Sequence, residues 1–258
     1  MRKEIPQKTE FEKKKTDYFV KLSIKVREAL QLHKTAGLWQ RNKAGKRDWG
    51  NVSEHCLVEV ARVRIFARLL NLSEEYTRAL TVAAAMHDFF KKGQKEIATA
   101  GELSRAAFAK ASEEANCIMR TAGVNEGVMK LVNAVGDESL LGIQRVLDQT
   151  ELEDDDIAFC IMHYVDDYTI NAEWAQPHSF DKRMDAAEAN PRYTRNNEEG
   201  RAVFNGETAY QAQRRIGHIV ERRLAELITQ KQGGSLDPLA LPEFIDAEIK
   251  KEIETTKS

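Results

Sequence analysis

Apolar residues in this chain recur almost everywhere at the spacing of an α-helix. Residues 16–33, 51–70, 73–87 and 207–229 each carry apolar side chains at intervals of three or four positions, which places them on one helix face. No segment bounded by turn residues alternates apolar and polar positions as a half-buried strand would. The sequence therefore predicts an all-α fold.

The predicted helices form one domain with additions at both ends. Residues 1–15 are expected to be a charged tail, and an all-α domain is expected over residues 16–230. Residues 231–258 begin with the linker sequence KQGGSLDP and continue as a short charged helix. Residues 173–206 contain two of the five prolines and are predicted to be an irregular loop, either a lid or binding segment or a solvated linker.

Composition argues against several classes of partner. The chain has 39 Lys and Arg residues against 41 Asp and Glu residues, so its net charge of −2 gives no general attraction to a nucleic-acid polymer or an anionic membrane. No apolar run approaches the length of a membrane span, and the charged start MRKEIPQKTEFEKKK is unlike a signal peptide. Cys56, Cys117 and Cys160 have no paired spacing, which predicts buried, reduced thiols. We therefore expect a cytoplasmic protein that binds neither a membrane nor a nucleic-acid polymer.

One apolar helix ends in two ionisable side chains. In the segment TVAAAMHDFF (residues 81–90), His87 lies on the apolar face and Asp88 follows it directly. A buried polar group costs free energy unless it has a partner. Each side chain is either satisfied separately inside the core, as single buried histidines often are, or shares a strong common partner with the other.

Further ionisable residues lie on other apolar helix faces. His55 is in the first turn of its helix, and Asp166 and Asp167 belong to the largely apolar helix 151–172. Imidazole and carboxylate ligands that converge in a helical core suit a divalent transition metal such as Mn²⁺, Fe²⁺, Co²⁺, Ni²⁺ or Zn²⁺. Such an ion lowers the pKa of bound water and neutralises a phosphate oxygen.

The order His55, His87–Asp88 and Asp166 resembles the HD superfamily of metal-dependent phosphohydrolases, which are all-α domains with this signature. AAAMHDFFKK is similar to the family stretch LLHDIGK, and HYVDDYT is similar to the ADKLDA-type helix, which favours Asp166 over Asp167 as the ligand. The resemblance covers residues 50–170, the expected metal core. It implies an HD-type helical bundle with N- and C-terminal helical appendages, in which one divalent transition metal ion is bound. Its expected ligands are His55, His87, Asp88 and Asp166.

The resemblance to HD enzymes also bears on the number of metal ions. Other HD enzymes hold two metals with extra histidines between the doublet and the final Asp. Here that interval contains only His163, which favours a single ion. His163 itself is expected either to orient Asp166 or to be a packed core residue.

A second stretch is similar to a narrower group. RDWGNVSEHCL (residues 47–57) is similar to the corresponding element of the HD-domain 5′-deoxynucleotidases, in which the arginine and the tryptophan contact the nucleotide. Arg47 and Trp49 are therefore candidate substrate contacts, the alternative being an exposed basic loop. The chain departs from that group at Lys91, where the deoxynucleotidases have a glutamate that is thought to assist catalysis.

Other basic residues are candidates for binding a phosphorylated substrate. Lys91 follows the doublet and could hold a phosphate as a point charge, the alternative being a solvated helix end. Arg192, Tyr193 and Arg195 could clamp a phosphate and a base, the alternative being a solvated linker.

These observations predict a hydrolase that cleaves a phosphomonoester, most directly a (deoxy)nucleoside 5′-monophosphate, with metal-activated water. Asp88 is expected to position or deprotonate the water, and Lys91 to assist. Two alternatives stay open: another phosphoester or a pyrophosphate as substrate, or a catalytically silent metal-binding regulatory or interaction module. The family resemblance also makes a homodimer an expectation.

Overall fold

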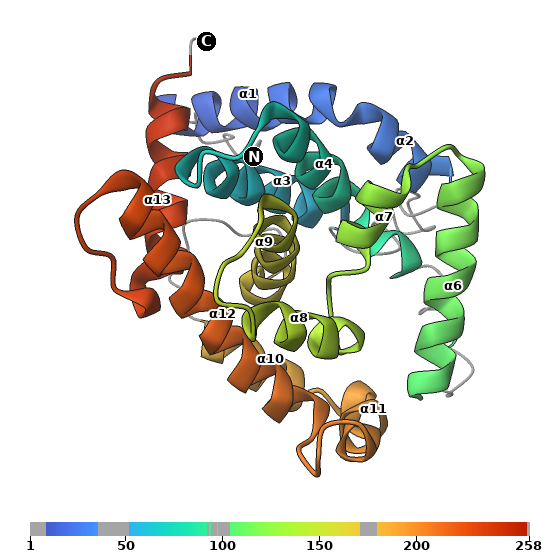
Figure 1. Ribbon diagram of the computed structural model, residues 1–258. Coiled ribbons are helices and arrows are strands. Elements are labelled where there is room, and N and C mark those ends of the chain that lie inside the picture. Colours follow the sequence, from blue (N-terminus) through green and yellow to red (C-terminus); the bar gives the residue numbers. More distant parts are fainter. Residues whose placement is uncertain are drawn as a thin grey trace, which may run out of the picture.

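The computed structural model describes residues 9–35, 52–91, 104–170 and 180–256, together with Gly93 and Ile97. In these ranges every regular element is helical and none is a strand, which confirms the all-α prediction (Figure 1). The α-helices and short 3-10 turns (η) are, in chain order, α1 (Glu10–Lys25), α2 (Arg27–Thr35), α3 (Val52–Leu69), α4 (Glu74–Met86), η1 (His87–Phe90), α6 (Arg105–Thr121), α7 (Glu126–Val132), η2 (Asp137–Ser139), α8 (Leu140–Leu147), α9 (Asp154–Tyr168), α10 (Phe180–Glu188), η3 (Pro191–Tyr193), α11 (Thr194–Glu199), η4 (Gly200–Ala202), α12 (Ala209–Gln232), η5 (Pro238–Ala240) and α13 (Leu241–Glu254).

Local side-chain chemistry sets where several helices begin. The Ser73 hydroxyl accepts a hydrogen bond from the Tyr76 backbone N–H at 3.3 Å, so Ser73 caps α4. Thr208 and Gln211 form a reciprocal capping box at the start of α12. These bonds satisfy N–H groups that the first helical turn leaves without a partner.

The inner part of the core is formed by α3, α4 and α9, which pack against one another. Helix α12 packs on α9, α2 packs on α4, and α1 and α13 pack on α3 (Figure 1). The ends of α3, α4 and α9 are thereby brought close together. This arrangement positions the candidate site.

The terminal helices are integral to the core, which corrects the prediction that they are appendages. Helix α1 begins at Glu10, inside the predicted tail of residues 1–15. Along α13 one apolar face is fully buried, and it consists of Leu241, Ile245, Ile249 and Ile253. A face of this kind is stable only against another apolar surface, which α3 and α1 supply.

The prediction of an irregular loop over residues 173–206 is wrong for most of that segment. From Phe180 to Ala202 the chain forms α10, η3, α11 and η4, and residues 171–179 lie outside the described part. The buried residues of α10 are Phe180, Met184 and Ala187, and their spacing places them on one face of the helix. The helix is short and polar elsewhere, so packing rather than local preference holds it.

Two smaller expectations also change. Cys56 and Cys160 are buried as predicted, but Cys117 is exposed because it lies on the outer face of α6. Helix α4 ends at Met86, and His87 begins the 3-10 turn η1. Within the described ranges, no helix combines the length and apolarity needed to cross a membrane.

Candidate metal centre

The four metal ligands expected from the sequence lie together in the structure. His55 is in the first turn of α3, and Asp166 is near the end of α9. His87 and Asp88 begin η1, directly after α4. Because α3, α4 and α9 pack against one another, residues more than one hundred positions apart meet at one point.

The distances between donor atoms are short. His87 Nε2 lies 3.5 Å from Asp166 Oδ1 and 3.6 Å from Asp88 Oδ1. His55 Nε2 lies 3.7 Å from Asp88 Oδ2 and 3.9 Å from Asp166 Oδ1. Ligand atoms about 2.1 Å from a tetrahedral ion are about 3.4 Å apart. The spacing therefore suits a transition-metal ion with little movement of the side chains.

Glu59 also belongs to this cluster, although it was not predicted from the sequence. It is fully buried one helical turn after His55, with Oε1 2.9 Å from His55 Nε2 and Oε2 3.2 Å from His87 Nδ1. His55, Glu59, His87 and Asp166 together form a group whose donor atoms all lie within 4.8 Å of one another. The signal in the sequence is the i, i+4 spacing of His55 and Glu59, which places both on one face of α3.

The orientation of His87 leaves one ring nitrogen directed at the cluster. Its Nδ1 lies 2.9 Å from the Ala84 carbonyl oxygen and also faces Glu59. Its Nε2 is buried and has no hydrogen-bond partner among the described residues. A histidine that ligates a metal through one nitrogen usually donates its other N–H to a carbonyl or carboxylate. The donor set and its geometry therefore fit a divalent metal ion.

The surrounding carboxylates raise the pKa values of both imidazoles. Burial by itself lowers the pKa of His55, but the carboxylates of Glu59 and Asp166 outweigh it and raise the pKa to about 10. Burial also acts to lower the pKa of His87, and Glu59 and Asp88 raise it well above its ordinary value. Without a metal, two imidazolium ions therefore balance the buried negative charge.

The carboxylates are held in their ionised form. Burial raises the pKa of Asp88, but Lys91 and the imidazoles outweigh it, so the pKa lies below its ordinary value. For Asp166 the burial effect is again the largest and raises the pKa, but the nearby imidazoles of His55 and His87 outweigh it and bring the pKa well below the ordinary value. Both groups are therefore charged and suited to bind a cation.

Cys56 is a less suitable ligand, although it lies within reach of His87 and Asp88. Its thiol is fully buried, and burial raises its pKa. Metals bind the thiolate rather than the thiol. Oxygen and nitrogen ligands thus define this centre better than sulfur does.

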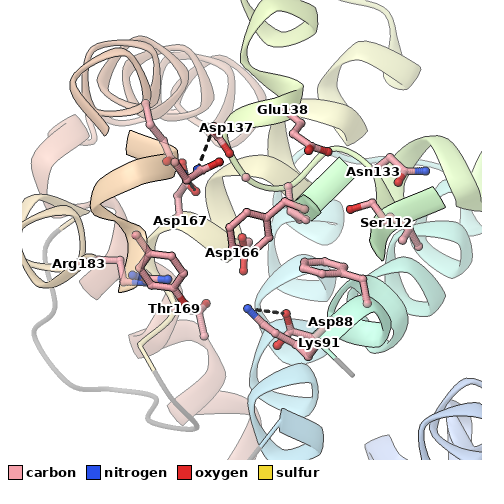
Figure 2. Close-up of a pocket in the computed structure, with 18 of the residues that line it drawn as sticks. Asp88, Lys91, Ser112, Asn133, Asp137, Glu138, Asp166, Asp167, Thr169 and Arg183 are labelled. Carbon is pink, nitrogen blue, oxygen red and sulfur yellow. Dashed lines mark hydrogen bonds and ion pairs between the residues drawn. The ribbon is translucent and has the colours of Figure 1, made fainter. Parts of the chain in front are cut away.

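The cluster lies at the wall of a cavity of about 520 Å³ (Figure 2). His55, Asp88 and Asp166 line the cavity, whereas Glu59 lies behind them and does not. Small-molecule sites commonly measure about 300–1,000 Å³. A small molecule in this cavity would reach the carboxylates directly.

The structure brings some of the expected substrate contacts to the cavity. Lys91 lines it, with Nζ 3.4 Å from Asp88 Oδ1, and Tyr193 lines it too. Arg195 does not line it, because its Nε binds Glu199 Oε1 at 2.8 Å on the surface of α11. Three further expected contacts lie outside the described part: Arg47, Trp49 and the side chain of Arg192.

His163 does not orient Asp166, one of the two roles left open for it. Its Nδ1 lies 3.0 Å from the Ala134 carbonyl oxygen, and its Nε2 lies 3.3 Å from Asp167 Oδ2. Gln213 donates to the other oxygen of Asp167 at 2.5 Å. His163 and Asp167 therefore form a separate buried pair, and Asp166 is the carboxylate of α9 that faces the cluster.

Several cavity residues were not foreseen. Arg183 comes from α10, Phe108 from α6, and Asp137 and Glu138 from η2. They meet only because helices distant in sequence pack around the cavity. Nothing in the local pattern of any one of these segments indicates this.

No protein-family model matches the chain, and no curated protein or solved structure is detectably similar to it. The similarity to HD phosphohydrolases therefore rests on the residues quoted above.

Proposed function

We propose that this protein is an HD-type, metal-dependent phosphohydrolase that cleaves a phosphomonoester, with a (deoxy)nucleoside 5′-monophosphate as the substrate. The proposal is carried by one observation: imidazoles and carboxylates from α3, η1 and α9 converge at the wall of an open cavity. A cluster with a purely structural role would be replaced by apolar side chains at little cost or with a gain in stability.

The ion would be held by His55, His87, Asp88 and Asp166, with Glu59 beside both imidazoles. When bound, a divalent ion polarises a phosphoryl oxygen and lowers the pKa of water. With neutral imidazoles, the three carboxylates of the cluster and the ammonium of Lys91 leave a net charge of −2. A divalent cation matches that charge, which supports the choice of ion.

Asp88 and Lys91 have complementary roles in this proposal. The ionised Asp88 accepts a hydrogen bond from the attacking water and orients it, and its low pKa makes it a weak base. Burial acts to lower the pKa of Lys91, but Asp88 outweighs it and the pKa lies above its ordinary value, so the ammonium keeps its charge and binds a phosphate oxygen. Hydrolysis joins the water oxygen to phosphorus and breaks the ester P–O bond, and the proton from water ends on the alcohol.

Beyond the candidate metal ligands, the cavity wall is suited to bind an organic group with a planar ring. Phe108, Tyr193 and Tyr210 line it, with the Phe108 and Tyr193 rings 6.4 Å apart and the Tyr193 and Tyr210 rings 6.5 Å apart. Aromatic side chains offer faces and edges on which a base can pack. This favours a nucleotide over an aliphatic phosphate.

The first test compares wild type with Asp166→Asn and Asp155→Asn. Both variants remove one carboxylate charge from α9. Asp155, however, is exposed, lies far from the cluster and pairs with Lys130. We expect about one transition-metal ion per chain in the wild type and in Asp155→Asn, and a loss of at least about tenfold in metal affinity in Asp166→Asn. Elemental analysis after dialysis against Mn²⁺, Co²⁺ or Zn²⁺ measures this.

The same three proteins are then assayed for phosphate release from a panel of nucleoside monophosphates. Release by the wild type and Asp155→Asn, with loss in Asp166→Asn, supports the hydrolase. Bound metal without release from any phosphoester or pyrophosphate would favour the regulatory module instead. If the wild type binds none of these three ions, the proposal is overturned.

A further inference from the structure

Charge is distributed unevenly along the cavity. Figure 2 shows Lys91 beside Asp88 and Arg183 near Thr169 on one side, with Asp137 and Glu138 at the opposite end. Among the described residues that line the cavity, Lys91 and Arg183 are the only lysine and arginine. The cationic side of the cavity therefore adjoins the candidate metal ligands, and the far end is acidic.

Arg183 differs from the arginines around it. Within the described part of the chain its guanidinium makes no hydrogen bond or ion pair, although it faces the cavity. By contrast, Arg214 on the neighbouring helix donates to Asp181 and to Asp185 at 2.7 Å each. A guanidinium without a partner in a cavity is suited to bind an oxyanion through two parallel hydrogen bonds.

The helix that carries Arg183 is firmly held. The Phe180 ring packs directly over Gly217 of α12, and the His218 ring packs against its edge at 5.2 Å between centroids. His218 Nε2 also lies 3.1 Å from Asp181 Oδ1. Because these contacts fix α10, the base of the Arg183 side chain is positioned before any ligand arrives, which lowers the entropic cost of binding.

The acidic end of the cavity is unsuited to a second phosphate. Asp137 is bound by Arg105 and faces Asn196, so its charge is partly neutralised. Glu138 is exposed to the cavity, and no partner for its carboxylate is present among the described residues. A carboxylate accepts hydrogen bonds from hydroxyl or amino groups and repels a phosphate.

We propose that Arg183 and Lys91 together bind a single phosphate group next to the candidate metal ligands. The acidic end of the cavity then selects an uncharged organic group with hydroxyl or amino donors. This inference rests on the proposed function and deepens it by naming the side chains that hold the phosphate and the end of the cavity that excludes a longer phosphate chain. Diphosphates and triphosphates are excluded, because their additional charge would lie against Glu138.

The test measures binding of inorganic phosphate by calorimetry, which does not depend on turnover. Arg183→Gln is compared with Lys182→Gln, which removes the same charge from an exposed neighbour on α10. We expect phosphate binding to weaken by at least about tenfold in Arg183→Gln and to change by less than about twofold in Lys182→Gln. Metal content stays that of the wild type in both, and Arg183→Lys recovers part of the binding.

A second measurement addresses the acidic end. Without repulsion, pyrophosphate would bind more tightly than phosphate because it carries more charge. We expect the wild type to bind pyrophosphate no more tightly than phosphate, and Glu138→Gln to gain affinity for pyrophosphate alone.

The outcomes separate this inference from the proposed function. Equal phosphate binding by the wild type and Arg183→Gln, with metal and phosphate release intact, would overturn the role of Arg183 and leave the hydrolase standing. Tight pyrophosphate binding by the wild type would overturn the monophosphate selection. Absence of metal and of turnover in the wild type would instead count against the proposed function.

Discussion

Glu59 lies between the two imidazoles of the candidate metal centre, with one carboxylate oxygen near each ring. Its contact with Nδ1 of His87 leaves Nε2 of that ring for the cluster. A fully buried carboxylate is costly unless it is paired. Glu59 therefore fixes the His87 ring through Nδ1, and its other oxygen lies beside His55 Nε2, the nitrogen that faces the other carboxylates.

The substitution Glu59→Gln keeps the shape of the side chain and removes its charge. In metal-free protein we expect the pKa of His55 to fall from about 10 towards its ordinary value of 6.5, because Glu59 is the largest source of the increase. The pKa is read from an NMR titration of the ring proton, with Glu226→Gln, at an exposed site on α12, as the control. An unchanged titration would show that Glu59 does not set the charge of this ring.

The same change alters how stability depends on pH. A raised pKa in the folded state means that protonation of His55 contributes stability in full below pH 6.5, and that this contribution is lost as the pH rises through about 10. Metal-free wild type should therefore lose stability over that range, and Glu59→Gln should lose less of it. Urea denaturation at several pH values measures both.

At the scale of single elements, α10 shows how one close helix contact positions a cavity residue. A Cβ on Gly217 would lie 2.1 Å from the nearest atom of the Phe180 ring. That ring is buried and stacks on Tyr164 with 6.2 Å between centroids, so it has little room to move. Close approach of α10 to α12 therefore requires glycine at this position.

We expect Gly217→Ala to destabilise the protein by about 1–3 kcal/mol, because the added methyl group displaces Phe180 and with it α10. The matched control is Gly142→Ala in α8, where a Cβ would be 3.5 Å from the Phe159 ring, an ordinary contact. That change should stabilise the protein by up to about 1 kcal/mol through helix propensity. Urea denaturation of both variants measures the difference, and equal effects would show that the α10–α12 contact can readily adjust.

At the scale of the whole molecule, a buried arginine links the C-terminal helix α13 to the candidate metal centre. Arg62 of α3 donates to Asp246 of α13 at 2.9 Å and 3.0 Å, and to the Thr169 hydroxyl at 2.7 Å. The Thr169 backbone N–H in turn donates to the Asp166 carbonyl oxygen at 3.2 Å. The end of α9 that carries the candidate ligand Asp166 is thus connected to α13.

The substitution Asp246→Asn leaves the buried Arg62 without its carboxylate. We expect a loss of about 3 kcal/mol or more in the free energy of unfolding, because the buried guanidinium loses the carboxylate that binds it through two hydrogen bonds. Glu248→Gln on the same helix removes a partner of the half-exposed Arg68 and should cost about 1 kcal/mol or less. Similar losses in the two variants, measured by urea denaturation, would contradict a central role for the Arg62–Asp246 pair.

Much of the fold and part of the site were predictable from local pattern. Helices with a regular apolar stripe, such as α3, α4 and α12, could be recognised because their periodicity reflects burial directly. His87 and Asp88 stood out because ionisable side chains at the end of an alanine-rich helix need a partner. Short polar helices such as α10 and α11 could not be recognised, because their stability comes from packing.

The sequence by itself determined the all-α class and the four residues expected to meet at a metal. Tertiary structure alone placed Glu59 between two imidazoles, brought Arg183 and Glu138 to opposite ends of one cavity, and joined α13 to the core. The physical reason is that periodicity reports which face of a helix is buried. It carries no information on which other helix, and which charged group, that face will meet.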